Sequence, residues 1–312
     1  DKWMIVSTSS PNLDGGARAI RAGGQVGGSP YPKTDAMDFI TISTAGNATD
    51  FGNLVRQKFG PAGAASRTRA VFMAGGTPIR LSEIDFVTFS STGNAADFGD
   101  MTVARAAGGD AGHSSETRAL LAAGSTPSSD ENDTIDFITI ASTGNGVDFG
   151  NLTRAVSGTL SSGNATRGLL AGGSFLPAYA YRNTIDIVTI ATTGNAQDFG
   201  TDLSFAGNGR CCENSTRALF QVAAGDNKQI EEVITATLGN GIQFGELSQT
   251  SDGGSFGTSD PTRGVFGLNT PSGGTNIMEY ISMSTGGTAV DFGDLTEAIT
   301  NSGAASNGHG GL

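Results

Sequence analysis

One unit recurs six times along this chain: a strand-like run, a short turn built on Gly and Asn, and the triplet Asp-Phe-Gly, which once reads Gln-Phe-Gly. The runs cover residues 40–52, 87–99, 138–150, 188–200, 234–245 and 281–293. The Phe of the triplet falls at positions 51, 98, 149, 199, 244 and 292, so successive copies lie 45 to 51 residues apart. A period near fifty residues filled with short strands is typical of a propeller blade.

The second repeat, residues 56–102, illustrates the strands and turns predicted for one blade. Residues 68–76 predict a strand that ends at a Gly pair, and residues 84–90 predict a second strand rich in β-branched and aromatic residues. A tight turn at 91–94 and a third strand at 97–101 follow. The second strand is apolar on both sides, which favours sheets packed on two faces, as in stacked blades. The small, Gly-rich run 104–112 suits an innermost strand near the axis.

The repeats predict one all-β domain, a six-bladed, kelch-like propeller of four-stranded blades. The N-terminal repeat lacks its small-residue strand, and residues 301–312 match that strand. We therefore expect the C-terminal strand to join the N-terminal blade and close the ring, which removes exposed sheet edges. The predicted propeller covers 14–312, after an N-terminal extension at 1–13 whose Trp3–Val6 segment is an extra strand or a subunit contact. The predicted blades are 14–55 with 298–312, 56–102, 103–153, 154–204, 205–248 and 249–297.

The composition restricts the partners. The net charge is −12, with only four lysines, which disfavours nucleic acid and anionic membrane surfaces. No apolar run approaches the length of a membrane span, so no membrane insertion is expected. The two cysteines, Cys211 and Cys212, are adjacent, and neighbouring cysteines bridge only with strain, so two free thiols are expected.

Two resemblances accompany the repeat. The order of a Gly pair after a strand, an extended strand, an aromatic residue and a small-residue strand resembles the kelch repeat, although Phe stands where kelch repeats usually carry Trp. The segment 134–145 with the following Asp-Phe-Gly-Asn-Leu-Thr, and the ending 306–312, resemble repeat proteins of marine and cyanobacterial tailed phages. That second resemblance implies a virion structural or tail-fibre component.

The sequence offers little catalytic chemistry. The Asp-Phe-Gly triplets lack the other kinase motifs, and no Walker, Rossmann or metalloprotease motif is present. His113 and His309 are the only histidines, and His309 aligns with a repeated Arg, so a structural role is expected. The acids of the triplets lack the dense spacing of a calcium loop. We therefore expect no enzyme activity, no cofactor and no metal site.

A repeated Arg and a repeated acid predict a structural ion pair in each blade. Each Arg begins a strand near the Gly-Asn turn, and each acid follows that turn, so the two charges are expected to meet. The predicted pairs are Arg18 with Asp50, Arg69 with Asp97, Arg118 with Asp148, Arg167 with Asp198, Arg217 with Gln243 and Arg263 with Asp291. A second set of acids is expected to bond within turns and between strands: Asp38, Asp85, Asp136, Asp186, Glu232 and Glu279.

The repeats diverge mainly in the loop after the Gly pair. These loops are residues 24–35, 76–83, 124–134, 172–184, 224–231 and 269–277. Aromatic and cationic residues on loops held by a rigid scaffold suggest a recognition face. The alternative is that surface loops vary in sequence without any role in binding. The candidate binding residues are Tyr31, Lys33, Arg80, Phe175, Tyr179, Tyr181, Arg182 and Lys228.

The leading functional hypothesis is a non-enzymatic phage virion protein, a tail fibre or decoration component that serves adhesion or assembly. Its partners would be other virion proteins, a host surface glycan or a host protein, and the sequence leaves a homo-oligomer open. The expected location is the tail or capsid surface, with an extracellular or cell-surface location as the alternative. A cellular kelch-like interaction module and a carbohydrate-active propeller enzyme are the competing hypotheses.

Overall fold

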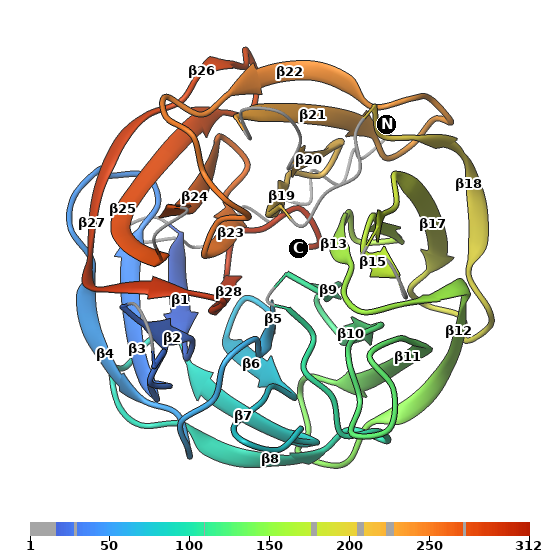
Figure 1. The fold of residues 1–312 in the computed structure, drawn as a ribbon, viewed down its shortest axis with the longest axis horizontal. Helices are drawn as coiled ribbons and strands as arrows, with labels where there is room; N and C mark the ends of the chain where they lie inside the picture. The colour runs from blue at the N-terminus through green and yellow to red at the C-terminus, as the bar shows by residue number, and fades with distance from the viewer. Residues whose placement is uncertain are drawn as a thin grey trace, which may run out of the picture.

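The computed structural model is a closed ring of six antiparallel sheets around a central axis (Figure 1). It describes residues 17–27, 30–108, 110–175, 180–204, 209–222, 228–270 and 273–312. The described residues contain no helix, and therefore none that could cross a membrane. The all-β, six-bladed propeller expected from the repeat is confirmed. The N-terminal extension lies outside the described residues.

The first three blades, from the axis outward, have the following strands. Blade 1 consists of β28 (Gly303–Ser306), β1 (Arg18–Ala22), β3 (Ala36–Thr41) and β4 (Thr49–Asn53). Blade 2 consists of β5 (Ala62–Ala65), β6 (Arg69–Met73), β7 (Glu83–Thr88) and β8 (Ala96–Asp100). Blade 3 consists of β9 (Gly112–Ser114), β10 (Arg118–Ala122), β11 (Asn132–Thr139) and β12 (Val147–Val156).

The other three blades repeat this order. Blade 4 consists of β13 (Leu160–Gly163), β14 (Arg167–Ala171), β17 (Thr184–Thr189) and β18 (Gln197–Asp202). Blade 5 consists of β19 (Cys211–Glu213), β20 (Arg217–Gln221), β21 (Gln229–Ile234) and β22 (Ile242–Glu246). Blade 6 consists of β23 (Phe256–Ser259), β24 (Arg263–Thr270), β25 (Gly273–Ser282) and β27 (Val290–Thr300). Short strands add to these sheets or form a separate hairpin: β2 (Gln25–Val26) pairs with β27, β26 (Gly287–Thr288) with β22, and β15 (Ser174–Phe175) with β16 (Ala180–Tyr181).

The ring closes as expected, because β28 pairs antiparallel with β1. Asn307 then completes the turn of blade 1 from the far end of the chain: its side-chain oxygen accepts a hydrogen bond from the Arg18 N–H at 2.8 Å. In blade 4 the equivalent Asn164 does the same for Arg167 at 3.0 Å within one turn. The C-terminal strand therefore replaces a local turn with a contact between distant residues.

The Gly-Asn turn of one blade forms hydrogen bonds with the Asp-Phe-Gly triplet of the preceding blade. The Gly144 N–H donates to the Phe98 carbonyl at 2.8 Å, and the Asn145 side chain accepts from the Asp100 N–H at 3.1 Å. Gly99, at φ 144°, lies so close that a Cβ there would stand 2.5 Å from the Gly144 oxygen. The most conspicuous motifs of the sequence are thus the parts that join one blade to the next.

Apolar side chains fill the spaces between blades. Each of six buried clusters draws its residues from two adjacent blades, as when Val71 and Met73 of blade 2 pack with Leu121 and Ile138 of blade 3. The strand predicted at residues 84–90 is β7, the third from the axis. It packs on both sides, as its composition predicted, because each sheet lies between two others. The innermost strand of blade 3 is Gly112–Ser114, which begins later than the run 104–112 indicated.

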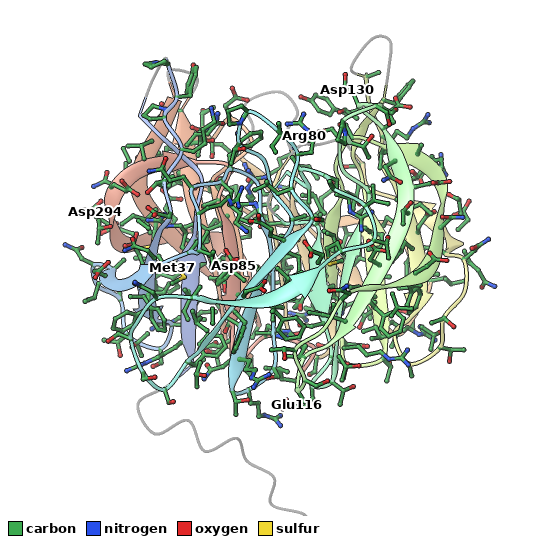
Figure 2. The ribbon with its side chains drawn as sticks, turned by 90° about the horizontal axis from the view of Figure 1, so that it is seen from below. Met37, Arg80, Asp85, Glu116, Asp130 and Asp294 are labelled. Carbon is green, nitrogen blue, oxygen red and sulfur yellow. The ribbon has the colours of Figure 1, made fainter. Side chains whose placement is uncertain are left out.

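The two ends of the ring differ in what they carry. We call the end with the β3–β4-type turns the hairpin face, and the end with the interblade links and the variable loops the loop face. Figure 2 shows Arg80 and Asp130 at the loop face and Glu116 at the opposite end. The sixth variable loop is shorter than expected, because β24 and β25 extend to Thr270 and from Gly273.

Candidate functional site

The axis of the ring holds a cavity of about 50 Å³ lined by the innermost strands. Small residues let the backbones approach: a Cβ on Gly112 would lie 2.3 Å from the Gly63 oxygen of the neighbouring blade. A polar cavity of this size has room for a few water molecules.

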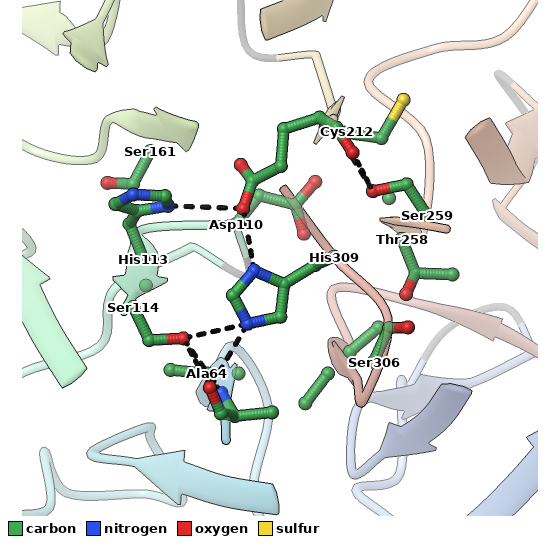
Figure 3. Close-up of a pocket in the computed structure, with 17 residues that line it drawn as sticks. Ala64, Asp110, His113, Ser114, Ser161, Cys212, Thr258, Ser259, Ser306 and His309 are labelled. Atoms are coloured by element: carbon green, nitrogen blue, oxygen red, sulfur yellow. Dashed lines mark hydrogen bonds and ion pairs between the residues drawn. The ribbon is translucent and has the colours of Figure 1, made fainter. Parts of the chain in front are cut away.

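Both histidines of the chain meet at this cavity around one carboxylate (Figure 3). The Nδ1 atoms of His113 and His309 lie 3.2 Å and 3.1 Å from Glu213 Oε1. His113 Nε2 also faces the Asn164 carbonyl at 3.1 Å, so each of its ring nitrogens lies near an acceptor oxygen. Burial alone would lower the pKa of His113, but the charge of Glu213 and its hydrogen bond outweigh it and raise that pKa. Burial likewise opposes the charged form of Glu213, yet the two histidines hold its pKa well below the usual range.

The C-terminal tail brings His309 to this position. Gly310 and Gly311 have no room for side chains, since a Cβ on Gly311 would stand 1.8 Å from the Ser114 oxygen and one on Gly310 2.4 Å from the Asn214 backbone. With Asn307 at the position of Asn164, His309 takes the position of Thr166 and not, as the sequence suggested, that of the repeated Arg, and it binds Glu213 across the axis. The tail thus covers the cavity on the hairpin side.

Ser114, His309 and Glu213 are connected in the order of a serine–histidine–acid triad, with Ser114 Oγ 3.1 Å from His309 Nε2. The surrounding contacts argue against nucleophilic chemistry. Ser114 Oγ donates to the Ala65 carbonyl at 2.8 Å, and His309 Nε2 faces the same carbonyl at 3.0 Å, so this nitrogen carries a proton and is no base. Ser259 of blade 6 makes the same reciprocal backbone contact with Glu213. The repeat therefore identifies Ser114 as a structural residue that joins blades.

On the loop side of the cavity, Asp110 is a buried carboxylate with poor charge compensation. Its Oδ2 accepts the Cys211 N–H at 3.0 Å, and burial raises its pKa to about 6. Among the described residues no cation lies within ion-pair distance, because the buried Arg210 donates to the carbonyls of Gly209 and Gly254. Cys211 and Cys212 are free and buried, as expected. Burial raises the pKa of both thiols well above the ordinary value, so they are poor nucleophiles.

The structure does not bring the predicted arginine–acid pairs together. Each repeated Arg donates instead to a backbone carbonyl of the following blade, as Arg118 Nη1 does to Ile190 at 3.0 Å. The other five contacts are Arg18 to Phe89, Arg69 to Ile140 and Ala141, Arg167 to Thr235 and Ala236, Arg217 to Met283 and Ser284, and Arg263 to Ile42. The expected partners are all exposed and form none of the ion pairs between described residues: Asp50, Asp97, Asp148, Asp198, Gln243 and Asp291.

An aromatic side chain takes the place that the ion-pair prediction gave to the acid. The guanidinium of Arg118 lies 4.7 Å from the Phe137 ring centroid, and this ring meets Phe149 of the triplet edge to face at 6.0 Å. Similar stacks place Arg18 over Phe39, Arg69 over Phe86 and Arg263 over Tyr280. Blade 5 differs, because Glu232 occupies the ring position and pairs with Arg217 at 3.1 Å.

The second set of acids is buried and joins blades near the loop face. The position in blade 5 belongs to Glu231 and not to Glu232, because Glu231 is the residue that faces Phe220 as Asp85 faces Phe72. Most of these carboxylates accept a hydrogen bond from a Thr or Ser hydroxyl of the preceding blade. That Thr or Ser directly follows the outer Leu or Met of its blade. The contacts are Thr102 to Asp136, Thr153 to Asp186, Ser204 to Glu231, Ser248 to Glu279 and Thr296 to Asp38. Asp85 instead binds the buried Lys58 at 3.0 Å. Lys58, in the link between blades 1 and 2, is therefore a structural residue.

The loop face places most candidate binding residues at the surface without gathering them into one site. Tyr31 and Tyr181 are 41% and 48% exposed. Lys33 and Arg80 both lie over Phe59, whereas Arg182 lies over Phe175 at 3.9 Å in blade 4. Lys228 donates to the Ser248 carbonyl at 3.2 Å. Tyr179 lies outside the described residues.

The hairpin face carries one departure from the repeat that the sequence analysis missed. Ile234, Leu238 and Ile242 of blade 5 are 37%, 71% and 57% exposed. The other blades have Thr or Ser at the position of Ile234. Aligning the six hairpins residue by residue would have revealed this apolar hairpin.

No family model matches the chain, and no curated protein matches it either. The kelch and phage resemblances therefore stay expectations from the residues. Among the described residues, no group of three or more His, Cys, Asp or Glu side chains is arranged to hold a metal ion. The loop face is therefore the part of the described surface where the side chains differ most from blade to blade.

Proposed function

We propose that the protein is a non-enzymatic recognition module of a phage virion, whose loop face binds a host-surface glycan, a host protein or another virion protein. The observation that carries the proposal is the contrast between the recurring interblade contacts and the varied loop side chains, such as the exposed Tyr181 and the half-buried Arg80. The virion assignment rests on the resemblance of the repeats to phage proteins.

The axial cavity supports this proposal indirectly. Catalysis would need a nucleophile or base within reach of a substrate. Ser114 is 1% exposed and engaged with backbone, and the thiol of Cys212 is buried. No observation therefore favours the carbohydrate-active enzyme. A cellular interaction module would use the same loop face, and only its location distinguishes it.

Cryo-electron microscopy of native particles tests the location and orientation of the ring. We expect the loop face to point outward or to contact a neighbouring virion protein. A chain absent from purified particles would refute the virion assignment. A ring that contacts its neighbours only through its hairpin face, with the loops also shielded from solvent, would refute recognition by the loop face.

A binding assay tests the face itself. Purified protein should compete with particles for adsorption to the host cell, and Tyr181→Ala should weaken that competition. Leu238→Ser, at the opposite end of the ring, is the matched control and should compete like the parent protein. If only Leu238→Ser weakens competition, the apolar hairpin of blade 5 is the binding surface and the proposal for the loop face is wrong.

A further inference from the structure

Three chain segments from two blades meet on the loop face beside Phe59. These segments are the loop after β1, the link 54–61 and the loop after β6. The link is fixed on both sides by backbone bonds: the Lys58 N–H donates to Thr34 at 3.2 Å, and Phe59 and Gly76 exchange two bonds at 2.8 Å. A Cβ on Gly76 would lie 2.7 Å from the Phe59 ring, so glycine lets the ring lie flat on the backbone.

Two cations converge on this fixed ring. Lys33 Nζ and Arg80 Cζ each lie 5.7 Å from the Phe59 centroid. Neither side chain belongs to an ion pair among the described residues, and the nearby Glu83 is taken by Arg56 at 2.8 Å. In a chain of net charge −12, two cations on one ring without a carboxylate partner form a local site for an anion.

The same place has exposed apolar surface and a strained backbone. Tyr31, two residues before Lys33, is 41% exposed and has a left-handed φ of 55°. Residues held in this region are strained, and such strain concentrates at functional sites. Ile79, next to Arg80, is 64% exposed. Two exposed apolar side chains, Tyr31 and Ile79, are thus close in sequence to the two half-buried cations that lie over Phe59.

We propose that Tyr31, Lys33, Phe59 and Arg80 form a binding site for an acidic saccharide, an inference that rests on the proposed recognition role of the loop face. The apolar face of a sugar ring packs on an aromatic side chain, and its carboxylate or sulfate pairs with Lys33 and Arg80. A folded protein partner would need about 800 Å² of surface on each side. Four side chains around one ring fit a sugar unit better than such an interface.

Matched oligosaccharides test the site in the full-length protein. The probes are sialyllactose against lactose, trigalacturonate against its methyl ester, and a sulfated heparin tetrasaccharide, each titrated by calorimetry at two salt concentrations. We expect an acidic probe to bind, its neutral counterpart to bind at least tenfold more weakly, and salt to weaken the acidic complex. Lys33→Gln and Arg80→Gln should each reduce affinity about tenfold, as expected for one lost charged contact of about 1.4 kcal/mol.

The matched control is Arg67→Gln, which removes a cation at the opposite, hairpin end of the ring, 3.9 Å from Glu116. It should leave the affinity unchanged, and the melting temperatures of all three variants should agree with that of the parent protein. Equal binding of neutral probes, no binding of any acidic probe, equal losses in Arg67→Gln, or preference for an acidic peptide such as hexaglutamate would each overturn the inference. In those cases competition for host adsorption that still depends on Tyr181 would leave the proposed function standing.

Discussion

The two ends of the ring are built from the same repeat but differ in how their charged groups are compensated. At the hairpin face, neighbouring blades are joined by backbone contacts that recur almost unchanged, and the buried carboxylate of Glu213 is compensated by two histidines. Toward the loop face, Asp110 has no ion-pair partner among the described residues, and neither do Lys33 and Arg80, which lie over one aromatic ring. Satisfied contacts stabilise the fold, whereas uncompensated charge is the common mark of a site kept for a partner.

Removal of residues 301–312 should have the largest effect, because it takes away β28, the turn contact of Asn307 and the His309–Glu213 pair together. We expect the melting temperature to fall by more than about 10 °C, or cooperative unfolding to be lost. Calorimetry measures this, and Asn307→Ala should show a much smaller decrease. An unchanged melting transition in the truncated chain would mean that the hairpin end does not depend on closure.

Gly150→Ala tests the backbone contact that joins blades 3 and 4. Gly150 has φ 144° and a Cβ there would stand 2.4 Å from the Gly194 oxygen, so we expect a loss of about 3–4 kcal/mol from strain and overlap together. Gly194→Ala is the matched control, since Gly194 has φ 155° but open space around it. Urea unfolding should show the larger loss in Gly150→Ala. Equal losses would assign the cost to backbone conformation alone.

Asp110→Asn tests the uncompensated charge near the loop end. Because the folded protein raises the pKa of Asp110 from 3.8 to about 6, it binds this proton more tightly than the unfolded chain does. The contribution of this group to stability is therefore fully present below pH 3.8 and is lost as the pH rises to about 6. The stability of the parent relative to Asp110→Asn should fall by about 3 kcal/mol between pH 3.5 and pH 7. A pH-independent difference would show that Asp110 is ionised normally.

Arg118→Ala should cost less, about 1–2 kcal/mol, through the lost hydrogen bond to Ile190 and the lost stacking on Phe137. Asp148→Ala should change the free energy of unfolding by less than about 0.5 kcal/mol, because Asp148 is exposed. This pair of variants separates the stacked arrangement from the ion pair that the sequence suggested. A larger loss of unfolding free energy in Asp148→Ala than in Arg118→Ala would support the predicted ion pair instead.

The sequence predicted the architecture well because the repeat encodes it locally. The period, the Gly-containing turns and the strand that is apolar on both faces (84–90 in the second repeat) each indicate a stacked blade. The missing strand of the first repeat indicated closure by residues 301–312. The arginine–acid pairing was wrong because proximity along one blade was taken for contact. Phe137 occupies the space beneath Arg118, and the nearest free acceptor belongs to the next blade.

The axial cluster was not predictable in the same way. His113, Glu213 and His309 come from blades 3 and 5 and from the C-terminal tail, and no spacing along the chain indicates that they converge. Within the loops, the surface exposure of Tyr181 and Tyr31 agrees with the recognition hypothesis. The arrangement of Lys33 and Arg80 around Phe59 required the link between blades 1 and 2 to be placed.

The contact between Arg18 and Asn307 spans 289 residues of chain, and this has a consequence for biosynthesis. Each pair of consecutive blades shares its own apolar cluster, so blades can pack in order as the ribosome delivers them. The first blade alone must wait for its innermost strand, β28, until the other five blades have emerged. Ring closure is then a late, long-range step, and its rate sets how long the inner edge of β1 stays open to pairing with another nascent chain.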